Sequence, residues 1–222
     1  MSFETKNILN IALIGHGNNG KTSLAESMLF CTGAIDRMGK VAEGTTVCDY
    51  DAEETSRQIT ISTAVAPVNF GGNKINVLDC PGFFDFVGDV HCALRAVECG
   101  AIVTSAKDTG EGLPVGAQRS WNYLKNAGLP VVFVISKTNE EHGDYFKALE
   151  TLKGKYGSIV CPVTIPTSDG NGVIDLVHNV AYHISLCLMV DITDQALSSG
   201  LLIPGVVRKG DYICIPGVHS YK

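Results

Sequence analysis

The sequence predicts an α/β fold, a doubly wound and mostly parallel β-sheet with helices on both faces. Apolar, β-branched runs recur along the chain at Ile8–Ile14, Ile75–Leu78, Ala101–Ser105, Val131–Ile135 and Ile159–Val163. Segments with helical spacing of apolar residues lie between several of these runs. Strands that are apolar on both faces and alternate with helices are typical of a parallel sheet that is covered on both sides.

Helices are predicted beside four of the runs, because apolar residues there recur three or four positions apart. The residues that carry this spacing are Leu24, Met28 and Leu29; Val90, Leu94 and Val97; Trp121 and Leu124; and Phe146, Leu149 and Leu152.

The segment Val41–Phe70 interrupts the alternation. It is polar at first, and then alternates through Ile59, Ile61, Thr63 and Val65 as an edge strand does. A long polar stretch before an edge strand predicts a mobile loop with a functional role.

Length and composition limit the classes of protein. The chain has 222 residues, 45% of them hydrophobic and 18% charged, which suits one globular domain, or one domain with a fragment. Its net charge of -6 argues against broad binding of nucleic acid, and we expect no specific DNA partner. Neither a signal peptide nor a membrane-spanning stretch is evident, so we expect a cytoplasmic protein.

Eight scattered cysteines, with no C-x-x-C pair, argue against a metal or disulfide framework. Cys92 and Cys99 lie seven positions apart, and we expect them to share the buried face of one helix.

The strongest chemical signal is the run Gly15–Thr22, which fits the phosphate-binding P-loop pattern G-x-x-x-x-G-K-[ST] between a predicted strand and a predicted helix. Such a loop turns backbone N–H groups toward phosphate oxygens at a helix start. Lys21 would reach the β- and γ-phosphates, and the Thr22 hydroxyl would bind Mg²⁺. The alternative is a chance glycine-rich turn, with His16 a packing residue. The nucleotide-binding residues predicted here are Gly15, His16, Gly17, Asn18, Asn19, Gly20, Lys21, Thr22 and Ser23.

A second motif, D-x-x-G, follows the second buried run as Asp79, Cys80, Pro81 and Gly82. A carboxylate at a strand end can hold Mg²⁺ through water, and glycine can present its N–H to a γ-phosphate. We therefore predict a P-loop nucleoside triphosphatase.

Three stretches, Gly33–Val41, Arg57–Ile61 and Asp79–Gly82, resemble the GTPase domain of elongation factor G, and most of all its elongation-factor-G-like paralogues. The likeness runs from about Asn7 to Tyr182 and includes Gly172–Leu176. It implies a translation factor that binds GTP or GDP with Mg²⁺ and hydrolyses GTP on the ribosome.

The resemblance also implies roles for individual residues. The loop before Thr60 would be switch I, and the segment after Asp79 would be switch II. Thr60 would close over Mg²⁺ only when a γ-phosphate is present. The implied metal ligands are Thr22, Thr60 and Asp79, and the implied catalytic residues are Lys21, Thr60 and Gly82.

Departures from the family's pattern predict altered function. Phe83 stands where the family often has a histidine that orients the attacking water, and phenylalanine makes no such hydrogen bond, so we expect slow hydrolysis. Ser136, Lys137 and Asn139 stand where the family has Asn-Lys-x-Asp, which predicts a weaker preference for guanine and better acceptance of xanthine. Asn18 replaces the usual P-loop aspartate.

We predict two regions: a translation-factor-type GTP-binding domain over 1–183, incomplete at its C-terminal end, and a divergent tail over 184–222. The tail includes two short expected strands on either side of Lys209–Asp211. A truncated or frame-shifted gene, or an internal deletion, would explain such an end. Three functions stay open: a ribosomal GTPase, a nucleotide switch that barely hydrolyses GTP, and a degenerate remnant.

Overall fold

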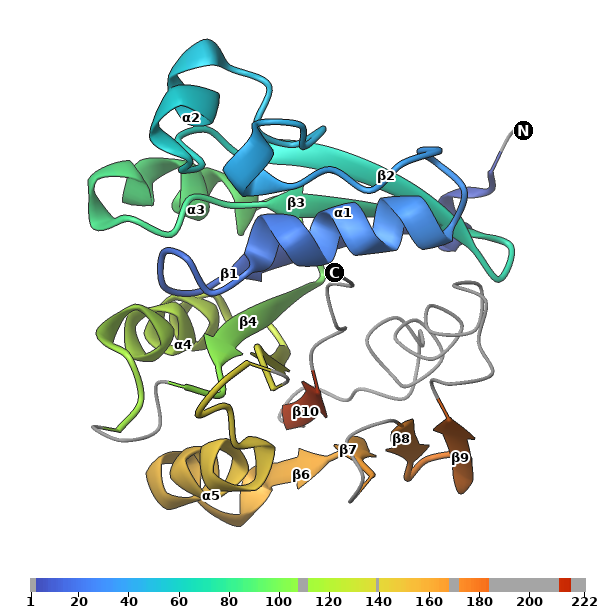
Figure 1. The fold of residues 1–222 in the computed structure, drawn as a ribbon, viewed down its shortest axis with the longest axis vertical. Helices are drawn as coiled ribbons and strands as arrows, with labels where there is room; N and C mark the ends of the chain where they lie inside the picture. The colour runs from blue at the N-terminus through green and yellow to red at the C-terminus, as the bar shows by residue number, and fades with distance from the viewer. Residues whose placement is uncertain (1–2, 108–111, 139, 168–171, 184–211, 217–222) are drawn as a thin grey trace.

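The computed structural model describes residues 3–107, 112–138, 140–167, 172–183 and 212–216. These residues form a main β-sheet with helices on both faces and a separate small sheet (Figure 1). The strands of the main sheet are β1 (Ile8–Ile14), β2 (Ala64–Phe70), β3 (Asn73–Asp79), β4 (Cys99–Ser105), β5 (Val131–Ser136), β6 (Val160–Pro162) and β10 (Tyr212–Pro216). The small sheet consists of β7 (Thr164–Pro166), β8 (Gly172–Asp175) and β9 (Val180–His183).

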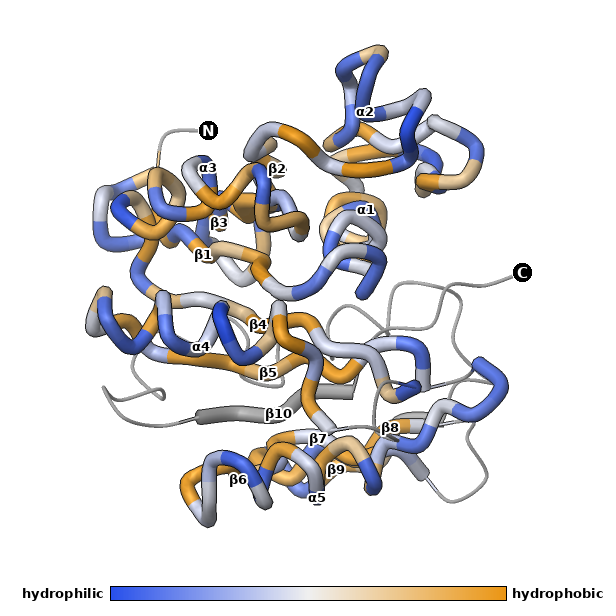
Figure 2. The backbone as a smooth tube through the Cα atoms, turned by 90° about the vertical axis from the view of Figure 1, so that its left-hand side faces the viewer, coloured by the Kyte–Doolittle hydropathy of each residue, from blue (hydrophilic) through white to orange (hydrophobic). Residues whose placement is uncertain are grey.

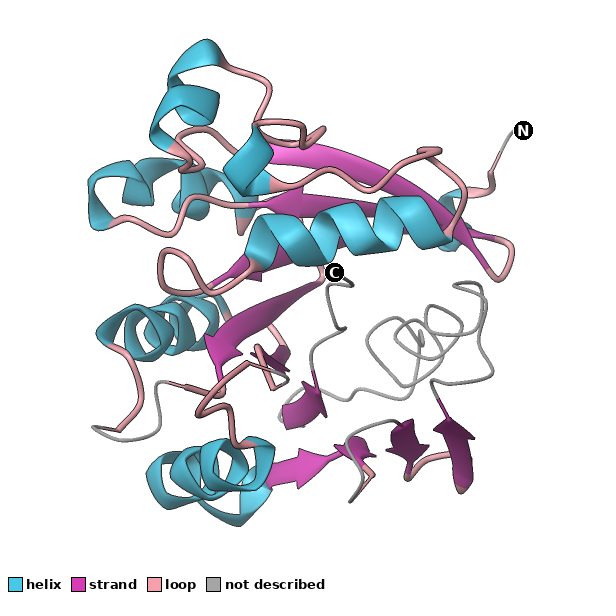
Figure 3. Ribbon diagram, in the orientation of Figure 1, coloured by secondary structure: helices cyan, strands magenta, loops and turns pink. Residues whose placement is uncertain are grey.

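Helices connect β1 to β2, β3 to β4, β4 to β5 and β5 to β6, as Figure 3 shows. They are α1 (Lys21–Cys31), α2 (Ala52–Arg57), α3 (Val87–Ala93), α4 (Val115–Ala127) and α5 (Tyr145–Tyr156). Short 3₁₀ turns lie at Thr5–Asn7, Val41–Glu43, Phe84–Phe86 and Gly157–Ile159. In the part of the chain that is described, no helix is both long and apolar enough to cross a membrane.

The main sheet has the strand order β2-β3-β1-β4-β5-β10-β6. All neighbouring strands are parallel except β2 and β3, which form an antiparallel pair at the edge. The predicted doubly wound, mostly parallel sheet is therefore confirmed. Because the parallel strands run in one direction, their carboxyl ends meet at a common edge of the sheet.

The two faces of the sheet carry separate apolar cores. Alternate residues of each strand pack into one core or the other. In β1, Ile11 and Leu13 lie in the core that contains Met28 of α1. Ala12 and Ile14 lie in the opposite core, with residues of α3, α4 and α5. Figure 2 shows apolar stretches along β1, β4 and β5. Burial on both faces explains why the strands read as continuous apolar runs.

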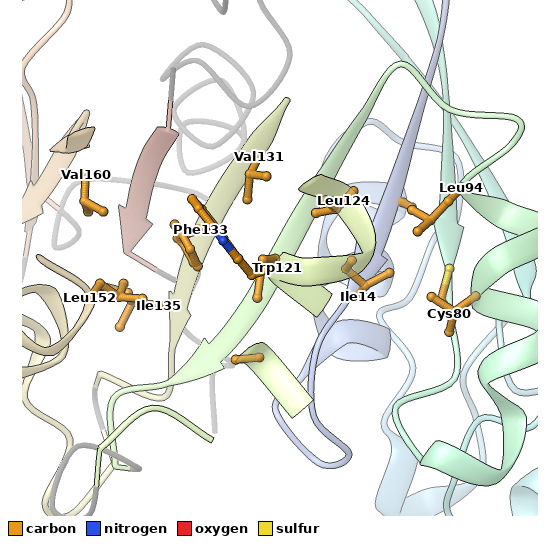
Figure 4. Close-up of a cluster of buried hydrophobic side chains, with 14 of the residues drawn as sticks. Ile14, Cys80, Leu94, Trp121, Leu124, Val131, Phe133, Ile135, Leu152 and Val160 are labelled. Carbon is orange, nitrogen blue, oxygen red and sulfur yellow. The ribbon is translucent and has the colours of Figure 1, made fainter. Parts of the chain in front are cut away.

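An aromatic stack fixes α4 and α5 on the second face. Phe133 of β5 is fully buried, and its ring centroid lies 5.7 Å from that of Trp121 (Figure 4). Trp121 in turn stacks on Tyr156, with ring centroids 4.0 Å apart. Such stacking adds about 0.5–1.5 kcal/mol per pair to the free energy of apolar burial.

Two details of side-chain burial differ from the sequence predictions. In the edge strand, Ala64, Ala66 and Val68 are buried while Val65 is exposed, so the alternation runs in the opposite phase to the one expected. Phe146 is exposed, because Tyr145 and Ala148 take the buried face of α5.

The two cysteines expected on one helix do not share it. Cys92 is exposed on α3, and Cys99 begins β4. The helix ends at Ala93 and therefore cannot bring both residues to one face.

The predicted tail contributes one described strand. The backbone of Tyr212–Pro216 pairs in parallel with β5 on one side and β6 on the other. The other strand expected in the tail falls outside the described residues. The boundary at residue 183 stays a prediction.

Substitutions in β2 test the observed phase of the strand. Val68→Ala should lower the free energy of unfolding by about 1–3 kcal/mol, because a fully buried side chain is truncated. Val65→Ala, on the exposed face of the same strand, should change it by less than about 0.5 kcal/mol. Urea unfolding of both variants measures this, and the reverse order of effects would contradict the assigned phase.

Candidate nucleotide-binding site

The predicted motifs meet at the carboxyl edge of the main sheet. The loop 15–20 joins the end of β1 to α1, Asp79 ends β3, and Ser136 ends β5. Because β1 lies next to β3 and close to β5 in the strand order, these ends lie close together. A cavity of about 370 Å³ opens there. It is lined by Gly17, Asn18, Gly20, Lys21, Thr22, Ser23, Val41, Ala42, Asp49, Gln58, Ile59, Thr60, Gly82, Phe83 and Lys137.

Lys21 is the buried cation of this cavity. Its side chain is 5% exposed, and its Nζ donates to the carbonyl oxygen of His16 at 2.8 Å and to that of Gly15 at 3.4 Å. Burial lowers the pKa of the Lys21 ammonium, and the nearby carboxylate of Asp79 opposes this shift. The loop carbonyls thus hold the ammonium at the start of α1. The ammonium and the helix dipole at this position both favour the binding of an anion.

The D-x-x-G segment packs directly on the P-loop. A Cβ at Gly82 would lie 2.5 Å from Lys21 Nζ and 2.7 Å from the Gly17 nitrogen, so only glycine fits there. A Cβ at Gly17 would in turn lie 2.9 Å from the Phe83 ring. Close approach of the Gly17 backbone therefore explains Gly82, and the Phe83 ring packs beside Gly17 on the wall of the cavity.

Four oxygen-bearing side chains gather beside Lys21. The Thr22 and Thr60 hydroxyl oxygens lie 3.1 Å apart. The Thr60 hydroxyl donates to Asp49 Oδ1 at 2.9 Å. Thr22 lies in the first turn of α1, Asp49 and Thr60 belong to the segment between α1 and β2, and Asp79 ends β3.

Asp79 has no exposed surface, and neither of its carboxylate oxygens has a hydrogen-bond partner within the described residues. Burial raises the pKa of Asp79 to about 7, and the charge of Lys21 and the neighbouring Thr22 hydroxyl oppose this shift. Burial also raises the pKa of Asp49, against the hydrogen bond from Thr60. Buried carboxylate oxygens without a partner, beside two hydroxyl groups, fit a hard divalent cation such as Mg²⁺.

The remaining predicted residues surround the cavity or support it. Gly15, Asn19, Cys80 and Pro81 are buried behind it. The Ser136 hydroxyl donates to the Asn19 carbonyl oxygen at 2.8 Å and to that of Thr104 at 3.1 Å, and so ties β5 to the P-loop.

Two predicted positions contribute differently. The His16 ring lies against Phe84, at 6.2 Å between centroids, and only its backbone carbonyl meets Lys21. Asn139 lies outside the described residues, and its contacts stay a prediction.

Sequence reasoning missed the acids that hold the segment around Thr60. We call residues 39–62 the Thr60 loop. Asp49 and Glu54 are buried within it, and Glu26 of α1 is buried against it. Glu54 Oε1 accepts from the Ile61 N–H at 2.9 Å and from the Ser62 N–H at 3.0 Å.

Two of these acids left a signal in the sequence. Asp51 and Glu54 form a capping box at the start of α2, and the pattern D-x-x-E announces one. Glu26 is an acid within a helix whose other residues are mostly apolar. Nothing in the sequence indicated a role for Asp49, because aspartate is common in polar loops.

Fold and site together define a P-loop nucleotide-binding domain. The sequence profile of the elongation factor Tu GTP-binding domain matches residues 6–205, and the chain belongs to this family.

Curated relatives agree with the family. The chain is 35% identical to an elongation factor G-like protein of Mycobacterium tuberculosis over 175 residues, which are 79% of this chain and 24% of that protein. It is 33% identical to elongation factor G 2 of Syntrophus aciditrophicus over 173 residues, or 77% and 25% of the two chains. The chain therefore spans about a quarter of the length of these relatives.

Solved structures agree with the fold. A crystal structure of a Thermus thermophilus protein superposes with a TM-score of 0.78 at 29% identity, covering 95% of this chain and 37% of that one. The translation elongation factor SelB of Methanococcus maripaludis, solved with the GTP analogue GppNHp, reaches a TM-score of 0.50 at 19% identity, over 72% and 27% of the two chains.

The raised pKa of Asp79 makes a pH-dependent prediction for the protein without metal or nucleotide. A carboxyl whose pKa is higher in the folded state destabilises the fold as pH rises, since the folded state must then hold a buried charge. The cost grows from the unfolded pKa, near 4, to the folded value of about 7. Asp79→Asn removes this cost.

The unfolding free energy of Asp79→Asn should therefore exceed that of the native sequence by an amount that rises from near zero at pH 4 to at most about 4 kcal/mol at pH 8. Urea unfolding in EDTA across this range measures it. Asp36→Asn, at an exposed position, should show no such trend. A difference that does not change with pH would contradict the prediction.

Proposed function

We propose that this chain binds GTP or GDP together with Mg²⁺ and hydrolyses GTP slowly to GDP in the ribosomal cycle of translation. The observation that carries the proposal is that Lys21, Thr22 and Thr60 line one cavity, with the carboxylate of Asp79 buried close to Lys21, in a domain of this family. The elongation factor names of the relatives support the link to translation.

Lys21 is the main phosphate-binding charge in this proposal. Its ammonium would exchange the carbonyl oxygens of Gly15 and His16 for β- and γ-phosphate oxygens. The N–H groups of the P-loop and the start of α1 would bind the same phosphates.

Thr22, Thr60 and Asp79 are the residues that would hold Mg²⁺. When bound, the ion would neutralise phosphate charge. The buried oxygens of Asp79 support this assignment, because they are without a partner among the described residues. Thr60 would turn its hydroxyl from Thr22 and Asp49 toward the site.

Slow hydrolysis follows from Phe83. Its ring lines the cavity beside Gly17, and it offers neither a donor nor an acceptor to an attacking water. The same observation favours a second candidate function, a nucleotide switch that binds GTP and GDP but barely hydrolyses GTP.

The base preference of the site, the location of the protein and its partners also belong to the proposed function. Asn139 replaces an aspartate that would accept two guanine N–H groups, and Ser136 is too short to repeat the contacts of the asparagine that it replaces. The preference for guanine over xanthine would therefore be narrow. We propose a cytoplasmic factor with the ribosome as partner, and with no membrane or specific DNA partner. That this chain shares the activities of a whole elongation factor is likewise part of this proposal.

Replacing Lys21 tests the binding site. Lys21→Ala should weaken the binding of GDP with Mg²⁺ by about tenfold to a hundredfold, because a charged partner of the phosphates is lost. Isothermal titration calorimetry with GDP, and with XDP for base selectivity, measures this. Lys125→Ala, on the exposed side of α4, is the matched control. Unchanged affinity in Lys21→Ala would refute the P-loop assignment.

Replacing Phe83 tests the catalytic step. Phe83→His should raise single-turnover GTP hydrolysis at least about tenfold, because a histidine can orient the attacking water. Both proteins should be measured with and without ribosomes. Brisk, ribosome-stimulated hydrolysis by the native sequence would show that Phe83 is tolerated, and the expectation of slow turnover would then be wrong.

A further inference from the structure

Glu26 is a buried acid that the proposed chemistry does not use. It lies on α1, five residues after Lys21, and its side chain has no exposed surface. Oε1 accepts the N–H of Val47 at 2.6 Å, and Oε2 accepts the N–H of Gly39 at 3.0 Å. A buried carboxylate is costly unless charge-assisted hydrogen bonds compensate it, and these two bonds do so.

These two N–H groups lie at the two ends of residues 39–47, a turn within the Thr60 loop. Within the turn, the Lys40 N–H donates to Thr45 Oγ1 at 3.0 Å, and the Thr45 N–H donates to the Lys40 carbonyl at 3.3 Å. The carboxylate of Glu26 closes the base of this turn against α1. We call Glu26, with the N–H groups of Gly39 and Val47, the Glu26 clamp.

The clamp lies close in the chain to the residues of the cavity. Cys48 follows Val47 and is buried, and Asp49 then accepts the hydrogen bond from Thr60. Two residues of chain reach at most about 7 Å, so the position of Val47 limits where the Asp49 carboxylate can lie. Thr60 returns to α1 through its contact with Thr22.

We propose that Glu26 is a positioning residue that fixes the first part of the Thr60 loop to α1, so that only the part after Val47 rearranges with the nucleotide. This inference rests on the proposed function, in which Thr60 closes over the γ-phosphate. The anchor and the phosphate-binding residues then share one rigid helix. A shorter free loop loses less entropy when it closes, which favours the closed form.

The chemistry requires a carboxylate at this position. Two N–H donors point at Glu26, and a carboxylate supplies an acceptor oxygen to each of them. Glutamine has the same shape but one acceptor, so its NH₂ group would face one of the N–H donors. Aspartate keeps both oxygens on a side chain that is one methylene shorter.

Amide exchange in the protein without nucleotide tests the clamp directly. In Glu26→Gln, hydrogen exchange measured by NMR should be at least about tenfold faster at Gly39 or Val47, since a bond to a charged group is lost. Glu150→Gln, an exposed acid on α5, should leave both amides unchanged. Amides of β1 report global opening, and their exchange should match the native protein. Unchanged protection of both Gly39 and Val47 in Glu26→Gln would overturn the proposal.

Nucleotide affinities separate positioning from a merely structural role. Glu26→Gln should bind GppNHp about tenfold more weakly while its affinity for GDP stays within about twofold, because closure of Thr60 involves the γ-phosphate. Equal losses for both nucleotides, or no loss, would overturn the positioning role. Glu26→Asp, whose carboxylate lies one methylene closer to the backbone of α1, should show the same pattern, because the clamp needs both bonds. If the native protein binds neither nucleotide, the proposed function fails, and the exchange measurement alone decides whether the clamp exists.

Discussion

The burial of Lys21 and Asp79 at neighbouring strand ends is the constraint on which this site depends. Both charges are buried, and the P-loop carbonyls hold the ammonium while the carboxylate oxygens have no hydrogen-bond partner within the described residues. Such an arrangement is unfavourable by itself, as the raised pKa of Asp79 indicates. The parallel sheet makes it possible, since the carboxyl ends of β1 and β3 are held side by side.

Buried acids are also a feature of the Thr60 loop. Asp49, Glu54 and Glu26 are all buried, and each accepts hydrogen bonds from hydroxyl or backbone N–H groups. Carboxylates that bind backbone N–H groups can organise a polar loop that has little apolar surface to bury. The loop is therefore held mainly by directional polar contacts, which can rearrange with less loss of packing than an apolar core.

The sequence predicted the mostly parallel sheet and a P-loop between a strand and a helix, but it did not predict features that depend on side-chain contacts. Runs such as Val131–Ile135 predict strands because burial on both faces leaves an apolar signature, and Gly15–Thr22 predicts a site because its spacing is chemically specific. The predicted phase of β2 was wrong. Val65 and Val68 are equally apolar, and only packing against α1 determines which of them is buried. Glu26 and Asp49 were missed because their partners are backbone and hydroxyl groups far away in sequence.

The place of β10 in the sheet has a consequence for how the chain folds during its synthesis. Tyr212 pairs with Val131 across roughly eighty residues, so one side of β5 has no partner strand until the chain that contains β10 has been made. An open, apolar strand edge can pair with another chain, and non-local strand pairing forms slowly. Nascent chains are therefore exposed to misassembly at β5 in the interval before β10 inserts between β5 and β6.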